Sequence, residues 1–336
     1  ACLLKAEGYD VVGVTMKLWN DEQPDAPRHS KGCCTIEDVE DARRVCQIIG
    51  APHYVMNFQR EFQAHVIDYF VAEYQRGRTP HPCLACNDRL KFDFLLQQAH
   101  FMDAECVATG HYPRTRSGPA PNRFRLLKGV DSGKDQSYVL FTLSQRELGR
   151  LLLPLGDPRK DQIRDIAAEA GLPGADKPDS QEICFIPSGD YRQFLAERIT
   201  PTPGDIVDQD GNMLGRHEGI EGFTIGQRRG LGFVTGEKTY VVKIDATFRR
   251  VVVGNEDELL QPALIAEDMS YTNGQEMDQP TEVMAKIRYK FPEVKATLYP
   301  KGSEAKIVFH RPQRAVTPGQ AVVFYQGERV LGGAII

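Results

Sequence analysis

The sequence predicts an α/β domain built on a parallel sheet, followed by a small β-rich domain and a C-terminal β-barrel. In the first half, strand-like apolar runs alternate with stripes of helical periodicity, which is typical of a Rossmann-like parallel sheet. After about residue 200, short β runs separated by turn signals replace this alternation. We therefore expect domains over residues 1–198, 199–263 and 264–336.

The elements of the first domain follow from periodicity and from turn residues. β-branched residues in VVGVTMKL predict a buried strand, and a capping box at Thr35 and Asp38 opens a helix that ends at Gly50. The predicted order is strand 11–18, helix 35–49, strand 53–58, a helix through 62–70, helix 88–100 and strand 105–110.

Three loops fall where the carboxyl edge of this sheet should lie. They are HPCLACN (81–87), GHY (110–112) and GVDSGKDQSY (129–138). In open parallel sheets, ligands bind at that edge. The sequence therefore predicts that these loops carry the functional residues.

The last third of the chain contains short runs that end in turn sequences such as KGSE (301–304) and YQGE (325–328). Their alternation predicts a small antiparallel barrel. The runs are TEVMAKIRY (281–289), KATLYP (295–300), AKIVFH (305–310), AVVFY (321–325) and RVLGGAII (329–336).

The composition is that of an ordinary globular protein, with 41% hydrophobic and 26% charged residues. No apolar run is long enough to span a membrane, and the start lacks a signal peptide, so we expect a cytoplasmic protein without a membrane partner. The eight cysteines end at Cys184, which does not resemble a secreted disulfide framework and favours reduced thiols.

The formal net charge of −5 argues against binding of nucleic acid by electrostatic attraction to the protein surface as a whole. The stretch from Thr281 to Arg314 is different, because it contains eight Lys and Arg residues but only three acidic residues. Tyr289 and Tyr299 lie among these basic residues in the sequence. Taken alone, this local basic face favours a solvated barrel surface over a nucleic-acid contact.

The beginning of the chain, ACLLKAEGYD, predicts a helix that leads into the strand at 11–18. A nucleotide-binding α/β domain normally opens with a strand and a glycine-rich phosphate loop. We therefore expect that this first strand and the phosphate loop are missing from the sequence.

The pair Cys83 and Cys86 in HPCLACN has a spacing used by metal ligands, redox switches and nucleophiles. Polar neighbours predict that at least one thiol is accessible, and a helix starting after Cys86 with Arg89 and Lys91 nearby would favour a thiolate there. No second such pair exists for a four-cysteine zinc site. Cys184 is equally well explained as a buried small hydrophobe, but with Cys83 and Cys86 it could hold three corners of an iron–sulfur cluster.

Long motifs make the chain resemble the bacterial tRNA-specific 2-thiouridylases, over nearly its whole length and in the order of that family. The motifs are MKLW (16–19), AEYQRGRTPHPCLACNDRLKF (72–92), ATGHY (108–112), LLKGVDSGKDQSYVLFTL (126–143), SQEICFIP (180–187), FTIGQRRGLG (223–232), KIRY (286–289) and AVTPGQAVVFYQGERVLGGAII (315–336).

The resemblance implies an α/β domain of the PP-loop ATP pyrophosphatase type and a C-terminal tRNA-binding barrel. It implies thiolation of the wobble uridine of Lys, Glu and Gln tRNAs, in which ATP with Mg²⁺ adenylates O2 and a sulfur from a relay protein then attacks C2. Cys86 matches the family's nucleophile and Cys184 its persulfide carrier, and the two would form a disulfide as sulfur is released.

The binding residues are implied in the same way. The family's target-base motif, Asn-Pro-Asp, corresponds here to His81, Pro82 and Cys83, so two of its three residues differ and an acid–base role at Cys83 is in doubt. The implied ATP contacts are Met16 and Gly110, and the implied tRNA contacts are His111, Lys134, Asp135, Gln136, Arg288, Tyr289 and Gln320.

Three alternatives stay open. The same thiolation could depend on an iron–sulfur cluster at Cys83, Cys86 and Cys184. The chain could also be a non-catalytic RNA-binding protein with a structural metal, although the DSGKDQSY and GQRRGLG blocks are more elaborate than a metal site needs. A thiol–disulfide oxidoreductase would need a thioredoxin-like neighbourhood, which the residues around the CxxC do not supply.

Overall fold

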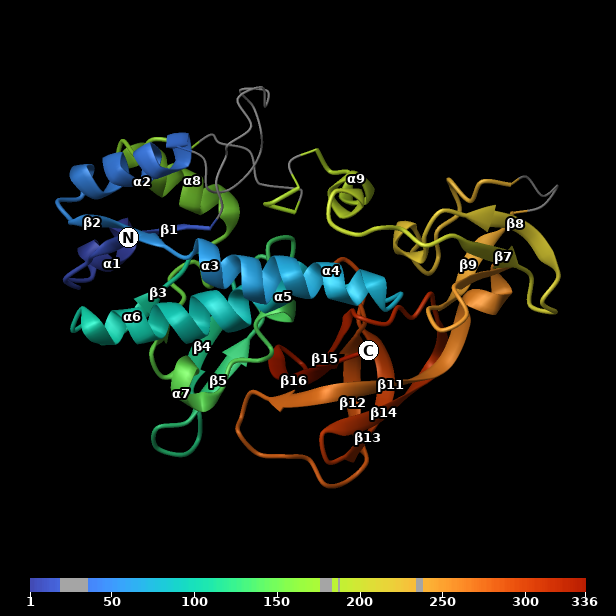
Figure 1. Cartoon of the computed structure of the whole chain (residues 1–336). Helices are drawn as coiled ribbons and strands as arrows, with labels where there is room; N and C mark the ends of the chain where they lie inside the picture. The colour runs from blue at the N-terminus through green and yellow to red at the C-terminus, as the bar shows by residue number, and fades with distance from the viewer. Residues whose placement is uncertain (19–35, 176–182, 187, 234–237) are drawn as a thin grey trace. The chain divides into compact units, whose positions relative to one another are not determined.

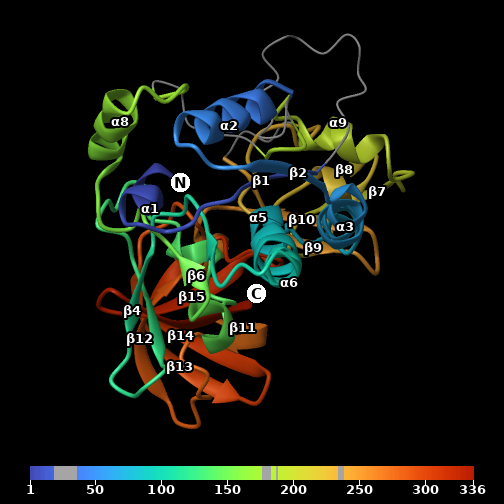
Figure 2. The same cartoon turned by 90° about the vertical axis from the view of Figure 1, so that its left-hand side faces the viewer.

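The computed structural model describes residues 1–18, 36–175, 183–186, 188–233 and 238–336. These residues form two compact units (Figures 1 and 2). Unit 1 consists of residues 1–67 and 83–190, and unit 2 consists of residues 68–82 and 191–336. Among the described residues, no helix is long and apolar enough to cross a membrane.

Unit 1 contains the expected strand–helix–strand arrangement near its start. Strands β1 (Gly13–Lys17) and β2 (His53–Asn57) are parallel, and helix α2 (Ile36–Ile48) lies between them in the chain. A Cβ at Gly13 would lie 2.3 Å from Sγ of Cys46, so only glycine lets α2 pack this closely on β1. The predicted strand, helix and strand are confirmed here with shorter bounds.

The rest of unit 1 combines short strands with helices. The parallel pair β3 (Val107–Ala108) and β6 (Leu151–Leu152) is separate from β1 and β2, and β4 (Arg114–Ser117) pairs with β5 (Phe124–Leu127) in an antiparallel hairpin that the sequence patterns did not predict. The helices are α1 (Cys2–Ala6), α3 (Gln59–Phe62), α5 (Pro82–Ala85), α6 (Leu95–Phe101), α7 (Gln145–Leu148) and α8 (Lys160–Glu169), with π-helical segments η1 (Gln63–Ile67) and η2 (Cys86–Phe94) and the 3-10 turn η3 (Ser137–Val139).

The helical part of unit 2 is held by aromatic packing. Helix α4 (Asp68–Gln75) faces α9 (Tyr191–Ala196) through Tyr74, whose ring stacks on Tyr191 with centroids 5.2 Å apart. Phe70 makes an edge contact with Phe194 at 6.1 Å. Because Tyr74 and Phe70 are buried, these contacts fix α9 on α4.

A four-stranded sheet follows α9 in the chain, in the order β8-β7-β10-β9. Strand β10 runs parallel to β7 and antiparallel to β9. The core of this sheet is mostly aliphatic and includes the fully buried Ile206, Val241 and Val251, together with the buried ring of Phe223. The bounds are β7 (Gly204–Val207), β8 (Met213–His217), β9 (Tyr240–Asp245) and β10 (Arg250–Gly254), with 3-10 turns η4 (Ile220–Gly222) and η5 (Asp257–Leu259).

The last six strands form a closed antiparallel barrel, as the sequence predicts. Their order is β11-β14-β13-β12-β15-β16, and β11 also pairs with β16. Alternate residues such as Ala296, Leu298 and Ile307 point inward and are fully buried. The bounds are β11 (Leu260–Tyr271), β12 (Thr281–Lys286), β13 (Val294–Lys301), β14 (Glu304–Arg314), β15 (Ala321–Gln326) and β16 (Arg329–Ile335).

Candidate functional site

The two cysteines of HPCLACN lie inside a helix, which corrects the expectation of a loop followed by a helix at residue 88. Helix α5 begins at Pro82, and Cys86 is the first residue of η2. A proline at the first helical position has a suitable φ and lacks only an N–H that would have no partner there, which explains the earlier start. Cys83 therefore lies in the first turn and is exposed, whereas Cys86 is one turn further on and is buried.

This placement removes the argument that a helix N-terminus following Cys86 favours its thiolate, because the helix starts before it. A π-helical segment is rare and occurs frequently at functional sites, since the wider turn redirects side chains. Cys86 therefore opens an irregular stretch of nine residues.

Asn87, next to Cys86, joins this helix to the GVDSGKDQSY loop. Its Nδ2 donates to the carbonyl oxygen of Val139 over 3.2 Å, and its side chain is buried. The loop itself is shaped by Asp135, whose carboxylate accepts hydrogen bonds from the N–H of Gly129 at 2.9 Å and from the hydroxyl of Ser137 at 2.7 Å. No sequence pattern singled out Asn87 as a residue that joins the two segments.

The predicted tRNA contacts in this part of unit 1 are therefore held by the protein itself. Besides the bonds to Asp135, Gln136 Oε1 accepts a hydrogen bond from the N–H of Tyr112 at 3.3 Å. The N–H of Lys134 donates to the carbonyl oxygen of Asp131 at 3.0 Å. These bonds give the loop a fixed shape, on which any RNA contact would depend.

His111 is a buried neutral imidazole rather than an exposed cation. Its Nδ1 lies 2.9 Å from the hydroxyl of Thr109, and its ring lies 6.0 Å from that of Phe92. Burial, with the nearby charge of Lys91, lowers the pKa of His111 to about 3. At neutral pH His111 therefore contributes no positive charge toward RNA.

The two predicted ATP contacts both lie at the carboxyl side of a parallel-paired strand. Met16 is the penultimate residue of β1 and pairs in register with Met56 of β2. Gly110 follows β3 by two residues and is exposed. In open α/β sheets, nucleotides bind at the carboxyl ends of parallel strands.

Cys184 is half-buried and is followed by two buried residues, Phe185 and Ile186. The Phe185 ring packs edge-on against Phe62 at the end of α3, with centroids 5.6 Å apart. Helices α3 and η1 in turn contact η2, which Cys86 opens. Residues 180–182 and 187 of the motif around Cys184, like Cys33, Cys34 and Thr35, lie outside the described residues.

Cys86 and Cys184 are both reduced in this structure, so the expected disulfide between them is not present. Among the described residues, which include Cys83, Cys86 and Cys184, no three His, Cys, Asp or Glu side chains lie close enough to hold a metal ion. The three cysteines therefore do not form a ready-made ligand set.

Within unit 2, the segment before Pro82 is bound to loops of the barrel. The N–H of Thr79 donates to the carbonyl of Pro318 at 2.8 Å, and Gln320 Nε2 donates to the carbonyl of Thr79 at 2.7 Å. A Cβ at Gly319, whose φ is +89°, would lie 3.0 Å from the backbone of Thr79. Gln320, a predicted tRNA contact, thus positions the chain just ahead of His81.

His81 and Tyr289 come from separate motifs and meet in unit 2. Their ring centroids are 6.3 Å apart and their planes lie at 78°, an edge-to-face contact. Burial lowers the pKa of His81 to about 4, so its imidazole is neutral at pH 7. The structure therefore brings a predicted target-base contact beside a predicted tRNA contact.

Arg288, the neighbour of Tyr289, is half-buried and engaged with the barrel. Its Nη2 donates to the carbonyl oxygen of Ala315 and to the hydroxyl of Thr317, and its guanidinium carbon lies 5.6 Å from the ring centroid of Phe291. A structural role thus accompanies the predicted phosphate contact. The exposed cations of the basic face are Lys290, Lys295, Lys301, Lys306 and Arg311.

Family profiles match the chain in three consecutive segments. Their descriptions are "tRNA methyl transferase HUP domain" for residues 1–188, "tRNA methyl transferase PRC-barrel domain" for 192–255 and "Aminomethyltransferase beta-barrel domain" for 261–336. The α/β unit, the four-stranded sheet and the closed barrel agree with this order of folds.

Curated relatives match along the entire chain. The tRNA-specific 2-thiouridylase MnmA of Moorella thermoacetica is 47% identical over 339 residues, covering 100% of this chain and 95% of the relative. The protein of the same name from Carboxydothermus hydrogenoformans is 48% identical over 339 residues, covering 100% and 93%. With identity at this level from one end to the other, the chain belongs to the tRNA-specific 2-thiouridylase family.

Proposed function

We propose that this protein is a sulfurtransferase that replaces the C2 oxygen of the wobble uridine in tRNA with sulfur. The observation that carries the proposal is the match to tRNA-specific 2-thiouridylases over 100% of the chain, which includes both cysteine motifs. Unit 1 holds Cys86 and Cys184 as reduced thiols, as sulfur chemistry requires. The proposed substrates are the Lys, Glu and Gln tRNAs, and the proposed location is the cytoplasm.

ATP with Mg²⁺ would supply the adenylate that turns the C2 oxygen into a leaving group. The residues that we assign to this role are Met16, which is half-buried near the end of β1, and Gly110, which is exposed just after β3. Activation is needed because oxygen bound to C2 of uracil is otherwise a poor leaving group. The chain's task at these residues is to hold the activated base within reach of the sulfur nucleophile.

In the proposed reaction Cys184 receives a sulfur atom from a persulfide donor protein. The terminal sulfur attacks C2 of the activated uridine and AMP leaves with the former oxygen. The Cys86 thiolate attacks Sγ of Cys184, so that the bond to the transferred sulfur breaks and a Cys86–Cys184 disulfide forms. External reduction of this disulfide by a thiol completes the cycle.

The contacts in unit 2 support RNA recognition near the target base. His81 meets Tyr289, and Gln320 fixes Thr79 two residues earlier. A neutral imidazole and an aromatic ring can stack on or hydrogen-bond a splayed base without the cost of burying a charge. Exposed lysines such as Lys290 and Lys295 supply cations for the phosphate backbone.

The test is a reconstituted reaction of the purified protein with an unmodified tRNA transcript, ATP, Mg²⁺ and a persulfide donor, with iron content determined on the same sample. We expect 2-thiouridine at the wobble position and one AMP per thiolated base. Binding of tRNA without AMP or thiouridine would favour a non-catalytic RNA-binding protein. Activity that scales with bound iron would favour the iron–sulfur alternative.

A further inference from the structure

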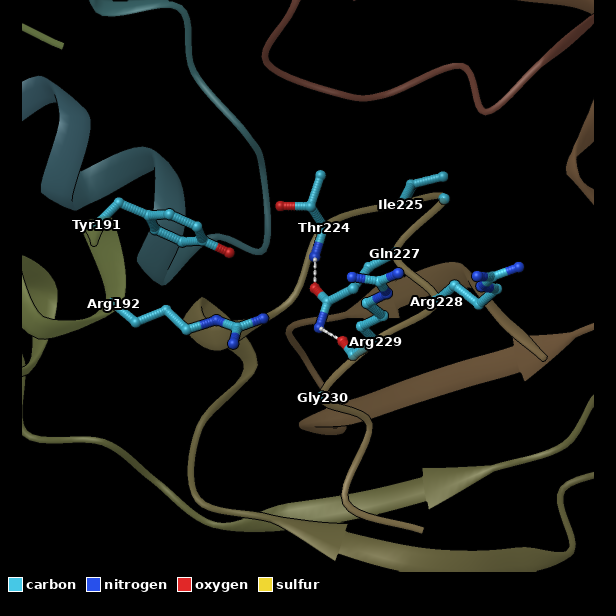
Figure 3. A pocket seen from close by; sticks show the side chains of 9 residues that line it. Tyr191, Arg192, Thr224, Ile225, Gln227, Arg228, Arg229 and Gly230 are labelled. Atoms are coloured by element: carbon cyan, nitrogen blue, oxygen red, sulfur yellow. Dashed lines mark hydrogen bonds between the residues drawn. The ribbon is translucent and has the colours of Figure 1, made fainter. Parts of the chain in front are cut away.

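Unit 2 contains a basic pocket that no step of the proposed reaction uses. It lies between the start of α9, at Tyr191 and Arg192, and the turn formed by residues 224–230. Its volume is about 680 Å³, which is ample for a phosphate and an attached sugar. Figure 3 shows Arg192 extending from α9 toward Gln227 and Gly230 on the opposite wall.

The turn that forms this wall is held in shape by hydrogen bonds. The N–H of Gly226 donates to the carbonyl of Val241 at 2.8 Å, and the N–H of Val241 donates to the carbonyl of Gln227 at 2.9 Å. The Gln227 side chain accepts from the N–H of Thr224 at 3.1 Å and donates to the carbonyl of Arg229 at 2.9 Å. These bonds give the wall one defined conformation before any ligand arrives.

Glycine at position 230 keeps the pocket open. Its φ is +69°, which L side chains rarely adopt, and a Cβ there would lie 3.4 Å from Nη1 of Arg192. Glycine therefore permits both the turn and the approach of the arginine. The part of the chain that the structure describes places no carboxylate in an ion pair with Arg228 or Arg229.

Within unit 2 the pocket is connected to the segment that leads to the predicted base contact. Thr79 Oγ1 donates to Oγ1 of Thr224 over 3.4 Å. Thr79 also accepts the hydrogen bond of Gln320, and His81, which contacts Tyr289, is two residues away. A polynucleotide bound at His81 would therefore pass close to the turn of residues 224–230, which contains Arg228 and Arg229.

We propose that this pocket binds a backbone phosphate of the tRNA, held by the guanidinium groups of Arg192 and Arg229. Planar guanidinium groups match phosphate geometry and remain charged at all physiological pH values. The inference rests on the proposed function, because it takes tRNA as the ligand. It adds a phosphate site formed by residues 191–192 and 224–230, which lie outside residues 281–314, the stretch whose charge is apparent from the sequence.

The test measures binding of an unmodified tRNA transcript at several salt concentrations to the full chain and to the double variant Arg192→Gln and Arg229→Gln. Loss of one phosphate contact should weaken binding about tenfold at low salt and reduce the slope of log K against log salt by about one unit. The double variant with Lys at both positions should keep the slope but bind more weakly, because an ammonium retains charge without the planar fork.

The matched control is Arg146→Gln on α7 of unit 1, which removes one exposed positive charge elsewhere and should leave the slope unchanged. An equal slope change in that variant, or none in the double Gln variant, would overturn the pocket as a phosphate site while leaving the thiolation assay positive. If the unaltered protein neither binds nor thiolates tRNA, both the pocket proposal and the proposed function fail.

A second arm distinguishes RNA phosphate from nucleotide phosphate, since guanidinium groups recognise both. ATP binding, measured by titration calorimetry, should be the same in the unaltered protein and in the double Gln variant. Weakened ATP binding with unchanged tRNA binding would show that the pocket takes a nucleotide and would overturn the assignment to RNA.

Discussion

The two compact units hold their predicted functional residues by different means. In unit 2 the residues around the predicted base contact are tied to the closed barrel by backbone hydrogen bonds, such as that from Thr79 to Pro318 at 2.8 Å. In unit 1 the predicted sulfur-carrying residues lie in irregular structure, because Cys86 opens a π-helical segment and Cys184 lies in a turn. The described strands of unit 1 are short, and within the unit they form the pairs β1–β2, β3–β6 and β4–β5.

This difference suits the two tasks. Recognition of a base benefits from groups that are fixed in advance, since ordering them on binding would reduce affinity. A sulfur relay requires that a thiol meet a donor protein, then the activated base, and then a second thiol. Cys184 lies in a turn without a regular hydrogen-bond ladder, and such segments open at a lower free energy, so Cys184 can change its contacts while the core stays folded.

The largest expected effect concerns the two cysteines of the relay. Cys86→Ser and Cys184→Ser should each lower thiolation by roughly 10³-fold or more. A hydroxyl at position 184 cannot carry the persulfide sulfur, and a hydroxyl at position 86 cannot release that sulfur by forming a disulfide. tRNA binding should stay within about twofold, since neither cysteine is among the predicted tRNA contacts. The measurement is 2-thiouridine formed per enzyme, with tRNA affinity determined on the same samples.

Cys83→Ser is the matched control for these variants. Cys83 is one helical turn before Cys86 but exposed, and the relay does not use it, so this variant should retain measurable activity. Loss of iron and activity together in all three variants would instead establish a cluster. Full activity in Cys184→Ser would eliminate both the relay and the cluster.

The helix that carries Cys83 and Cys86 was predictable from the sequence only in part. Hydrophobic periodicity located a helix near residues 88–100, but the structure starts that helix at Pro82. Polar neighbours made the HPCLACN stretch look like a loop, while the buried side chains of Leu84 and Asn87 became evident only from the fold. Pro82 at the first helical position sets this boundary, a local signal that apolar periodicity does not contain.

The barrel was more predictable because its signal is local. Alternating apolar residues and turn sequences such as KGSE at 301–304 directly encode strand pairs, and β13 and β14 pair across that turn. Strand β11, with a core residue at Leu264, was not predicted, since its register is interrupted between Gln261 and Ala263. The meeting of His81 with Tyr289 could not be derived from spacing, because about 200 residues separate them and only the fold brings them together.

A second expected effect tests how tightly unit 1 is packed at its first strand. Gly13→Ala should destabilise unit 1 by about 1–3 kcal/mol, because the new Cβ would lie 2.3 Å from Sγ of Cys46. Removing that sulfur in the double variant Gly13→Ala and Cys46→Ala should restore part of the loss. The measurement is the free energy of unfolding in urea for the single and double variants.

Gly222→Ala in unit 2 provides the comparison, because a Cβ there would have no neighbour within 4 Å. Its stability should stay within about 0.5 kcal/mol of the unaltered protein. Additive losses in the Gly13 and Cys46 double variant would show that contact with the sulfur does not cause the destabilisation.

A third effect uses one imidazole from each unit whose pKa burial lowers strongly, His111 and His81. His111 in unit 1 has a pKa near 3 when folded, against 6.5 for an unperturbed histidine. Below pH 6.5 the unfolded state therefore binds a proton that the folded state does not, so stability should fall as the pH falls, by about 1.4 kcal/mol per pH unit at most. In unit 2, His81 should act in the same direction down to its folded pKa of about 4.

Amide hydrogen exchange at pH 7 and pH 5, corrected for intrinsic rates, would resolve the two units. His111→Gln should reduce the pH dependence of protection in unit 1 and leave that in unit 2 unchanged. The converse is expected for His81→Gln. The same pH dependence in a variant and in the unaltered protein would mean that the substituted histidine does not carry the effect.

The smallest expected effect asks whether Arg288 belongs to the RNA surface, to the barrel framework, or to both. Its guanidinium donates to Ala315 and Thr317, so both Arg288→Lys and Arg288→Gln should lower the free energy of unfolding by about 1–2 kcal/mol. Only Arg288→Gln removes the charge, and it should reduce the salt slope of tRNA binding by about one unit if the residue faces a phosphate. Lys301→Gln, at the exposed end of β13, removes the charge of a side chain that makes no hydrogen bond or ion pair among the described residues. Suppose that Arg288→Gln lowers the free energy of unfolding but leaves the salt slope of tRNA binding unchanged, while Lys301→Gln changes only that slope. Arg288 would then serve only the barrel framework, and unit 2 would bind RNA through its exposed lysines.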